Sequence, residues 1–317
     1  MKSNPWDNIT ISKYKHSING FLADKNNLIE FFWAKDLFGN FLFVVHTKST
    51  ILVNKIPKLQ GIDIEINQIN DNETQVILKL LSKNDKDIFY TLCKDLLNST
   101  KNIMDENIAV KTILKRLEKW QFFLKNRRKP IDKRQLKGLI GELYFIEKYL
   151  FPNFDVKDIL DFWKAPLDSV HDFEISNTTV EVKTKSSVNS ITISSYEQML
   201  SELDNLYLFV VGLNESSKNT VNSITIYNII DKIQELILER NPLLIEKFEI
   251  LLINYGFIPL DEYKDLYFVI ISDEFYEVKD NFPKIENIPN GIEKLTYRID
   301  LNSCREFLVK KDIFKDE

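Results

Sequence analysis

Four ionisable residues fall on two neighbouring runs in which polar and apolar residues alternate. These runs, separated by the polar residues 176–179, predict a β-hairpin. A four-residue loop pairs Asp172 with Lys183 and Glu174 with Glu181. Because successive side chains of a strand point to opposite faces, the four ionisable side chains share one face and the apolar ones share the other.

The charges on that face indicate a metal site. Three carboxylates beside one lysine repel each other unless more positive charge is present, and Lys183 supplies only one charge. Mg²⁺ prefers such hard oxygen ligands, with one or two carboxylates completed by water and a substrate phosphate. We therefore expect a Mg²⁺ site, in which Mn²⁺ would substitute.

Phosphodiester hydrolysis is the chemistry that suits these residues. Asp172 and Glu181 would hold the ion, which polarises the phosphate and lowers the pKa of a bound water. Lys183 would orient the attacking water and stabilise the charge that develops on the phosphate. A glycosidase is a poor fit, because its two-carboxylate chemistry does not need Lys183.

Further residues could complete this site, and one competes with it. Glu142, on a predicted helix, would complete the metal ligands or bind a second ion. Asp168, which ends a literal Pro-Leu-Asp, is the alternative first ligand. Asp172 is preferred because it begins the strand that pairs with the Glu181 strand. The residues that could position water or contact phosphate are Gln198, Lys185, Ser186 and Ser187, although a polar strand end explains the last three equally well.

A basic run at residues 125–134 is the predicted DNA contact. The net charge of −5 does not favour a polyanion partner, so any contact with nucleic acid must be local. A solvated linker is the alternative reading of such a run. The residues expected to bind DNA are Arg127, Arg128, Lys129, Lys133 and Arg134.

The first part of the chain reads as β-rich. Strands are predicted on both sides of a turn at residues 38–40, then at residues 51–56 and 74–82. Helical spacing of apolar residues follows, from Ile88 to Leu97 and from Ile113 to Leu124. We expect a β-rich region over residues 1–125 that ends in helices and recognises DNA or a partner.

The second part, residues 126–317, reads as the catalytic core. Asp132 is placed to cap a helix that runs to about Phe151, and its Gly138 and Gly141 share a face suited to close packing on a sheet. After Pro152 a loop leads to the hairpin. The remaining predictions are a short helix from residue 196, a strand at 206–213, a helix at 226–240, and separate strands at 248–257, 266–272, 275–280 and 294–301.

Composition narrows the class of protein. A hydrophobic fraction of 44% supports a packed core and excludes disorder. Two cysteines, Cys93 and Cys304, and three histidines offer no zinc spacing. The N-terminus lacks a signal-peptide core, and the longest apolar runs are shorter than the roughly 20 residues that cross a bilayer. We expect a cytoplasmic protein without a membrane partner.

The order of these motifs resembles the PD-(D/E)XK nuclease superfamily. There an acidic residue opens one strand, (D/E)-x-K lies on the next, and the first core helix often adds a glutamate. Here His171-Asp172 stands where the superfamily has Pro-Asp. GLIGELYFIEKYL, HDFEI to VEVKTKS, ITISSYEQML and the tail FYEVKDNFPKIENIPNGIEKLTYRIDL are similar to the bacterial "PD-(D/E)XK motif protein" family over nearly the whole chain. The tail is distinctive, but no chemistry follows from its residues.

This resemblance implies an α/β (α+β) fold, with a restriction-endonuclease-like core whose mixed β-sheet is flanked by helices. It also implies a DNA endonuclease of restriction or phage-defence type, with DNA methyltransferases and ATPases of the same locus as partners. Cutting both strands needs two sites, so a homodimer is expected. Two alternatives stay open: a catalytically silent scaffold or nucleic-acid-binding subunit, and a nuclease acting on RNA or branched DNA.

Overall fold

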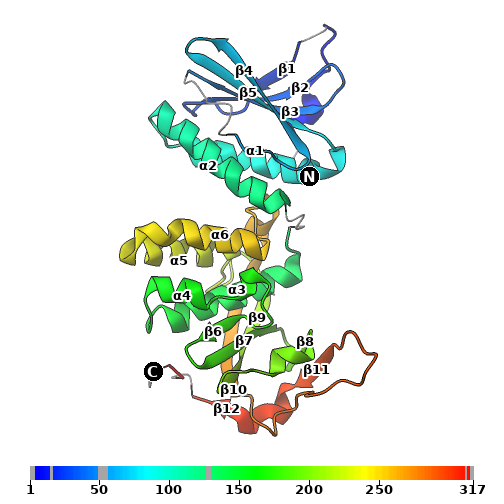
Figure 1. Cartoon of the computed structure of the whole chain (residues 1–317), viewed down its shortest axis with the longest axis vertical. Helices are drawn as coiled ribbons and strands as arrows, with labels where there is room; N and C mark the ends of the chain where they lie inside the picture. Colours follow the sequence, from blue (N-terminus) through cyan, green and yellow to red (C-terminus); the bar gives the residue numbers. More distant parts are fainter. Residues whose placement is uncertain (1–3, 15–16, 49–55, 126–129, 311–312, 315–317) are drawn as a thin grey trace. The chain divides into compact units, whose positions relative to one another are not determined.

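The computed structural model describes residues 4–14, 17–48, 56–125, 130–310 and 313–314 (Figure 1). The chain divides into two compact units, residues 1–128 and 129–317. Both combine helices with β-sheet, which confirms the predicted α+β class. Of the strand predicted at residues 51–56, residues 51–55 lie outside the described part of the chain.

The first unit is an antiparallel sheet followed by two helices, α1 (Lys86–Thr100) and α2 (Glu106–Lys125). The sheet packs on α1 through aromatic side chains, because Trp6 stacks on both Phe41 and Phe89. Its strand order is β1-β2-β3-β5-β4. The strands are β1 (Asn19–Leu22), β2 (Glu30–Lys35), β3 (Phe41–Thr47), β4 (Ile62–Asn70) and β5 (Glu73–Leu80).

The second unit is built on a mixed sheet of order β12-β10-β9-β7-β6. Only the β7–β9 pair is parallel; the other neighbours are antiparallel. This is the predicted mixed sheet. The strands are β6 (Phe173–Ile175), β7 (Thr178–Lys185), β9 (Asn205–Ser216), β10 (Tyr267–Glu277) and β12 (Leu308–Val309).

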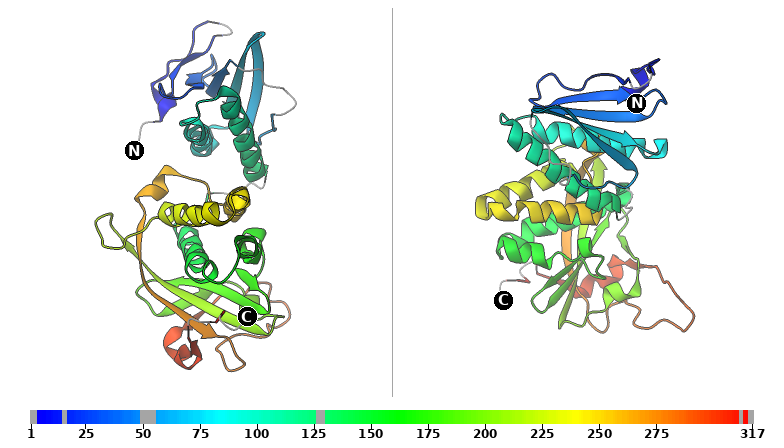
Figure 2. Two further views of the ribbon diagram at one scale, coloured as in Figure 1. Left: turned by 90° about the vertical axis from the view of Figure 1, so that its left-hand side faces the viewer. Right: turned by 45° about the horizontal axis from the view of Figure 1, so that its top comes forward.

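Helices cover one face of this sheet, and a smaller layer covers the other (Figure 2). On the first face α3 (Lys133–Phe145) lies against β7 and β9, and α5 (Ile226–Arg240) packs on α3. α4 (Val156–Phe162) and α6 (Ile245–Tyr255) complete this layer. The second layer contains the pair β8 (Ser190–Ile193) and β11 (Tyr297–Asp300) and the 3₁₀ helix η9 (Leu301–Phe307).

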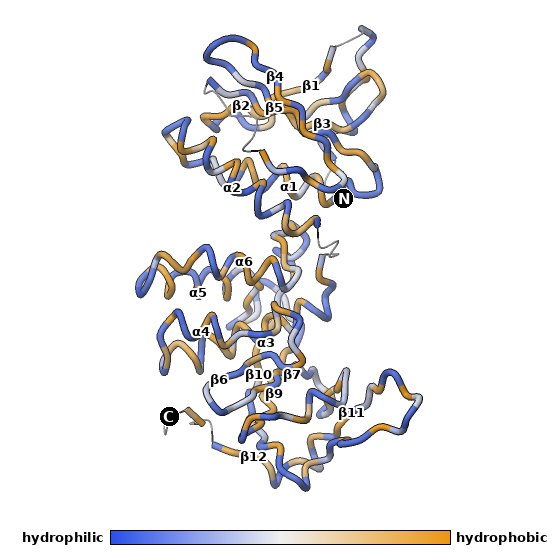
Figure 3. Tube along the Cα trace, in the orientation of Figure 1, coloured by the Kyte–Doolittle hydropathy of each residue, from blue (hydrophilic) through white to orange (hydrophobic). Residues whose placement is uncertain are grey.

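Alternating polarity along the helices follows their burial. In Figure 3, α5 and α6 change repeatedly between hydrophobic and hydrophilic residues. On α5 the buried side chains recur at helical spacing, at Ile226, Ile229, Ile230, Ile233 and Ile237. Within the described part of the chain, every helix is too short or too polar to span a bilayer.

The helix α3 begins and packs as its sequence predicts. Asp132 forms a capping box, accepting a hydrogen bond from the Gln135 backbone at 2.8 Å while the Gln135 side chain accepts one from the Asp132 backbone at 3.0 Å. At Gly141 a Cβ atom would lie 2.8 Å from the Thr184 Cγ2 atom of β7. The glycine therefore lets α3 approach the sheet more closely than any larger residue would.

Replacing Gly141 by alanine should destabilise the protein through this contact. The added methyl group meets packed side chains, and overpacking costs about 1–3 kcal/mol. Gly138→Ala is the control on the same helix, since its methyl would meet only the Tyr255 hydroxyl, at 3.3 Å. In urea unfolding, Gly141→Ala should be less stable than Gly138→Ala; equal stabilities would contradict the close-packing role.

Two segments fold differently from their predictions because their apolar patterns were ambiguous. The stretch after Pro152, predicted as loop, contains α4. The segment around residues 248–257, predicted as strand, belongs to α6. Short apolar runs do not distinguish a strand from a buried helix, whereas Gly256, at φ +101°, marks a helix C-terminus.

Two other elements are longer or more irregular than predicted. The strands predicted at 266–272 and 275–280 join into the single strand β10, with a register shift between Ile270 and Ser272. The helix predicted to reach Phe151 changes to a π-helical turn at Ile146–Leu150. Both irregularities depend on pairing and packing, which local sequence patterns do not contain.

Candidate functional site

The predicted hairpin forms, but its register was wrong by two residues. Ser176 and Asn177 alone make the turn, so Phe173 pairs with Val180 and Glu174 pairs with Thr179. An even shift leaves every side chain on its predicted face. Because of this shift, Glu174 no longer lies opposite Glu181. Glu174 is half-buried, and its carboxylate lies 4.0 Å from the Lys164 ammonium.

The strand β6 is short, which leaves one edge of β7 without a partner strand beyond Val180. Asp172 fills the start of this gap, because its Oδ2 atom accepts a hydrogen bond from the Val182 backbone at 2.8 Å. The backbone oxygen of Asp172 accepts hydrogen bonds from the Lys164 and Ala165 amides, at 2.8 and 3.2 Å. Its carboxylate is thus held at the open edge of the strand.

Glu181 and Lys183 form a buried ion pair on β7. The Glu181 side chain is fully buried, and its Oε2 atom accepts no hydrogen bond among the described residues. Burial, followed by the nearby charge of Asp172, raises the pKa of Glu181 to about 8. The charge and the hydrogen bond of Lys183 oppose this shift but do not outweigh the burial of the carboxyl group.

The pKa values of Asp172 and Lys183 are also raised, but for different reasons. Burial raises the pKa of Asp172, although the Lys183 charge opposes the shift. For Lys183, burial acts to lower the pKa, but the charges of Glu181 and Asp172 outweigh it and raise the pKa. The lysine is therefore held in its charged form by the carboxylates around it.

Glu142 joins this group from α3, as predicted. Its carboxylate is buried and accepts a hydrogen bond from the Trp163 indole at 2.7 Å and one from the Tyr255 hydroxyl at 2.8 Å. Burial and then the charge of Asp172 raise its pKa well above the usual range. Trp163 is thus a buried core residue, and Tyr255 on α6 is a contributor that sequence reasoning missed.

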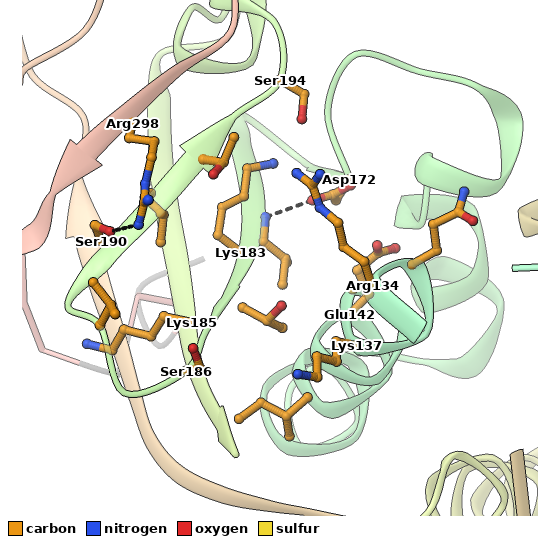
Figure 4. A pocket seen from close by; sticks show the side chains of 18 of the residues that line it. Arg134, Lys137, Glu142, Asp172, Lys183, Lys185, Ser186, Ser190, Ser194 and Arg298 are labelled. Carbon is orange, nitrogen blue, oxygen red and sulfur yellow. Dashed lines mark hydrogen bonds between the residues drawn. The ribbon is translucent and has the colours of Figure 1, made fainter. Parts of the chain in front are cut away.

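A pocket of about 720 Å³ opens over these residues (Figure 4). Asp172, Lys183 and Glu142 line it, whereas Glu181 lies fully buried beneath Lys183. The start of α3 forms one wall and the β8–β11 pair forms the other. The remaining polar lining residues of interest are Arg134, Lys137, Lys185, Ser186, Ser190, Thr192, Ser194 and Arg298.

The other predicted candidates are placed differently. Asp168 lies outside the pocket lining, exposed after the 3₁₀ helix Ala165–Leu167 at a left-handed φ of +60°. Ser187 is also exposed outside the lining, although its neighbour Ser186 is part of it. Gln198 accepts a hydrogen bond from the Ser194 backbone at 3.0 Å and closes its own turn. Lys185 lines the pocket.

The predicted basic run is described in part, and its described members Lys133 and Arg134 have different surroundings. Arg127, Arg128 and Lys129 lie outside the described residues. Lys133 forms an ion pair with Glu215 at 2.6 Å, which Lys137 also joins at 2.8 Å. These two lysines lower the pKa of Glu215 to about 2. Of the described basic residues of this run, Arg134 alone lines the pocket.

Lys137, Tyr255 and Arg298 are among the lining residues that were not predicted. Lys137 lies one helical turn from Arg134, so helical spacing could have found it. Arg298 belongs to the distinctive C-terminal motif, which signalled importance without indicating a chemical role. Nothing local marked Tyr255, because its contact with Glu142 joins residues that are far apart in the sequence.

The donors at this site suit a hard divalent cation. The Oε2 atom of Glu181 is an unsatisfied buried acceptor, and the carboxylate of Asp172 lies close enough to raise the pKa of Glu181. Within the described ranges, no three acidic, histidine or cysteine side chains are grouped so as to hold an ion by themselves. Two carboxylates completed by water and phosphate fit Mg²⁺, which keeps several waters when it binds.

Comparison with known protein families gives a match over nearly the whole chain. The model of a family described as "Putative PD-(D/E)XK family member, (DUF4420)" matches residues 2–302. No curated protein and no solved structure matches the chain. The matched range includes the hairpin, Glu142 on α3, and Arg298 near its C-terminal end.

Proposed function

The chain belongs to this PD-(D/E)XK family, whose membership suggests a nuclease, and from that premise we propose that it is a Mg²⁺-dependent DNA endonuclease. The observation that carries the proposal is the open edge of β7. There Asp172, Glu181 and Lys183 meet, and Glu181 keeps one buried oxygen without a hydrogen bond. This combination suits phosphodiester hydrolysis better than any role in folding alone.

Asp172 and Glu181 are the proposed metal ligands. When bound, Mg²⁺ would polarise the phosphate and lower the pKa of a coordinated water. Lys183 would stabilise the charge that develops on the phosphate as the new P–O bond forms and the leaving oxygen departs. Glu142 is less suited to bind the ion directly, since each of its oxygens already accepts a hydrogen bond. It is better suited to fix the position of α3 beside the site.

Lys183 has a second proposed role in the metal-free protein. Its ammonium contacts the Oε1 atom of Glu181 and so partly neutralises a buried carboxylate. A divalent ion at Glu181 would make that contribution unnecessary. The flexible lysine stem could then turn its ammonium into the pocket, which it already lines, towards a substrate phosphate.

The wider function follows the family resemblance. DNA is the proposed substrate, with residues 1–125 recognising DNA or a partner and a homodimer supplying two sites for double-strand cutting. A role in restriction or phage defence, beside a methyltransferase and an ATPase, is part of the same proposal. Plasmid cleavage with Mg²⁺ or Mn²⁺, on methylated and unmethylated DNA, tests it. Wild-type protein that cuts neither, alone or with its partners, would contradict it.

Metal titration separates the nuclease from a silent scaffold. Asp172→Ala should weaken Mn²⁺ binding at least about tenfold in calorimetry, the size of loss typical when a metal site loses a supporting group. Asp168→Ala is the matched control, because it removes the rival acid of the Pro-Leu-Asp sequence outside the pocket lining. If Asp168→Ala weakens Mn²⁺ binding and Asp172→Ala does not, Asp168 is the metal ligand. Unchanged Mn²⁺ binding in both variants would favour the scaffold.

A further inference from the structure

The cations that line the pocket differ in whether an acidic side chain neutralises them. Lys183 is paired with Glu181, Lys137 with Glu215, and Lys185 with Glu274 at 2.9 Å. Arg134 and Arg298 have no carboxylate partner among the described residues, and both are exposed. The pocket therefore presents two arginine charges that its own acidic residues leave available.

The C-terminal motif presents Arg298 from a rigid position. Arg298 lies on β11 opposite Thr192 of β8, and its guanidinium donates a hydrogen bond to the Ser190 hydroxyl. The next residue, Ile299, is buried in the core that also contains Ile191 and Ile193. Because side chains alternate along the strand, anchoring Ile299 in this core directs Arg298 to the pocket side.

Arg134 extends from the opposite wall. It lies in the first turn of α3, which the capping box of Asp132 fixes. Figure 4 shows Arg134 and Arg298 reaching into the pocket from different sides, with Lys183 between them. The two arginines thus flank the proposed catalytic lysine.

The positions of the two arginine charges suit a nucleic-acid backbone that passes across the site. The pocket floor carries Asp172 and Glu142, which repel an anion in the absence of a cation, so additional phosphate contacts are favourable only at the walls. An arginine fork can donate two hydrogen bonds to one phosphate, and Ser190, Thr192 and Ser194 add hydroxyl donors on the β8 wall.

We propose that Arg134 and Arg298 bind the nucleic-acid phosphates on either side of the one held at Lys183. The identity of the central phosphate rests on the proposed function; the two flanking contacts rest on the pocket walls. This role also gives a purpose to the tail motif, since its strand β11 supplies Arg298.

Binding to a labelled DNA duplex tests the proposal, with an RNA duplex of the same sequence as a second arm. All variants are made in a Lys183→Met background, which should slow cleavage enough for binding to be measured with Mg²⁺ present. Arg134→Gln and Arg298→Gln should each weaken DNA binding about tenfold, and each should reduce the slope of log K against log[salt] by about 0.9. The matched control is Arg305→Gln, which removes an exposed arginine of η9 outside the pocket lining and should change neither quantity.

The outcomes separate this inference from the proposed function. Arg134 and Arg298 variants that bind DNA and RNA like the Arg305 variant would overturn the inference even if the wild type cuts DNA. If both variants weaken binding but the wild type cuts nothing, the inference stands and the nuclease proposal fails. If the two variants weaken binding to RNA but not to DNA, the proposed phosphate contacts stand and the proposed substrate changes from DNA to RNA. No binding in either arm would overturn the inference.

Discussion

Replacing Lys183 by methionine is expected to lower the rate of DNA cleavage by about 10²- to 10³-fold, the effect of removing one group that stabilises transition-state charge. Methionine keeps a flexible apolar stem but removes the ammonium that contacts Glu181. Single-turnover cleavage at saturating Mg²⁺ measures the effect on chemistry. Equilibrium binding to the same duplex should change much less, because the ammonium acts mainly on charge that develops during the reaction.

The matched control for this prediction is Lys185→Met. Lys185 lies two residues further along β7, lines the same pocket, and is also ion-paired, to Glu274. It has no contact with Glu181, so its loss should cost less than about tenfold, as for a contact that only helps to bind the substrate. Equal losses in the two variants would show that both lysines act only through the general charge of the pocket.

Folding must be checked in the same experiment. Removing Lys183 leaves the buried Glu181 carboxyl group without the hydrogen bond that the ammonium donates, and an unsatisfied buried polar group costs about 1–3 kcal/mol. The Lys183→Met variant should therefore unfold at a lower temperature than wild type without metal, and Mg²⁺ should restore part of that difference. A variant that is fully folded with Mg²⁺ and still cuts at the wild-type rate would exclude a catalytic role for Lys183.

The metal-free protein is expected to lose stability as pH rises from about 4.5 to about 8, at up to about 1.4 kcal/mol per pH unit from Glu181 alone. Over this range the folded chain keeps a proton on Glu181, whose pKa is raised to about 8. The unfolded chain has already released it, since the ordinary pKa is 4.5. The stabilisation is therefore complete below the unfolded pKa and is lost as pH rises through the folded pKa.

Urea unfolding of wild type and Glu181→Gln at several pH values, with EDTA, measures this contribution. Other groups, such as Glu215 with its lowered pKa, change stability in the opposite direction, so the difference between the two proteins is the informative quantity. From pH 5 to pH 8, the free energy of unfolding of Glu181→Gln should rise steadily relative to that of wild type. Mg²⁺ should stabilise wild type most at high pH, where Glu181 can ionise without competing for a proton. A difference that does not vary with pH would contradict the raised pKa.

The sequence by itself determined the features that depend on neighbouring residues. Glu181 and Lys183 share a face in any register, because E-x-K needs only period-two alternation. The same locality explains the correct start of α3 at its Asp132 cap and of α5 after Thr225. It also explains why the hairpin register could be wrong by two residues while every side chain kept its face.

Tertiary structure alone decided which residues surround that pair. The shortness of β6 opens the edge of β7, and so brings Asp172 to the site while Asp168 stays outside the pocket lining. Glu142 contacts Tyr255, and Arg298 faces the same pocket from a strand more than a hundred residues beyond β7. These contacts depend on how sheets and helices pack, and their energies come from burial and long-range hydrogen bonds. Local patterns of polarity do not encode such partners, which is why the Glu181–Lys183 pair could be read from the sequence, whereas Tyr255 and Arg298 could not.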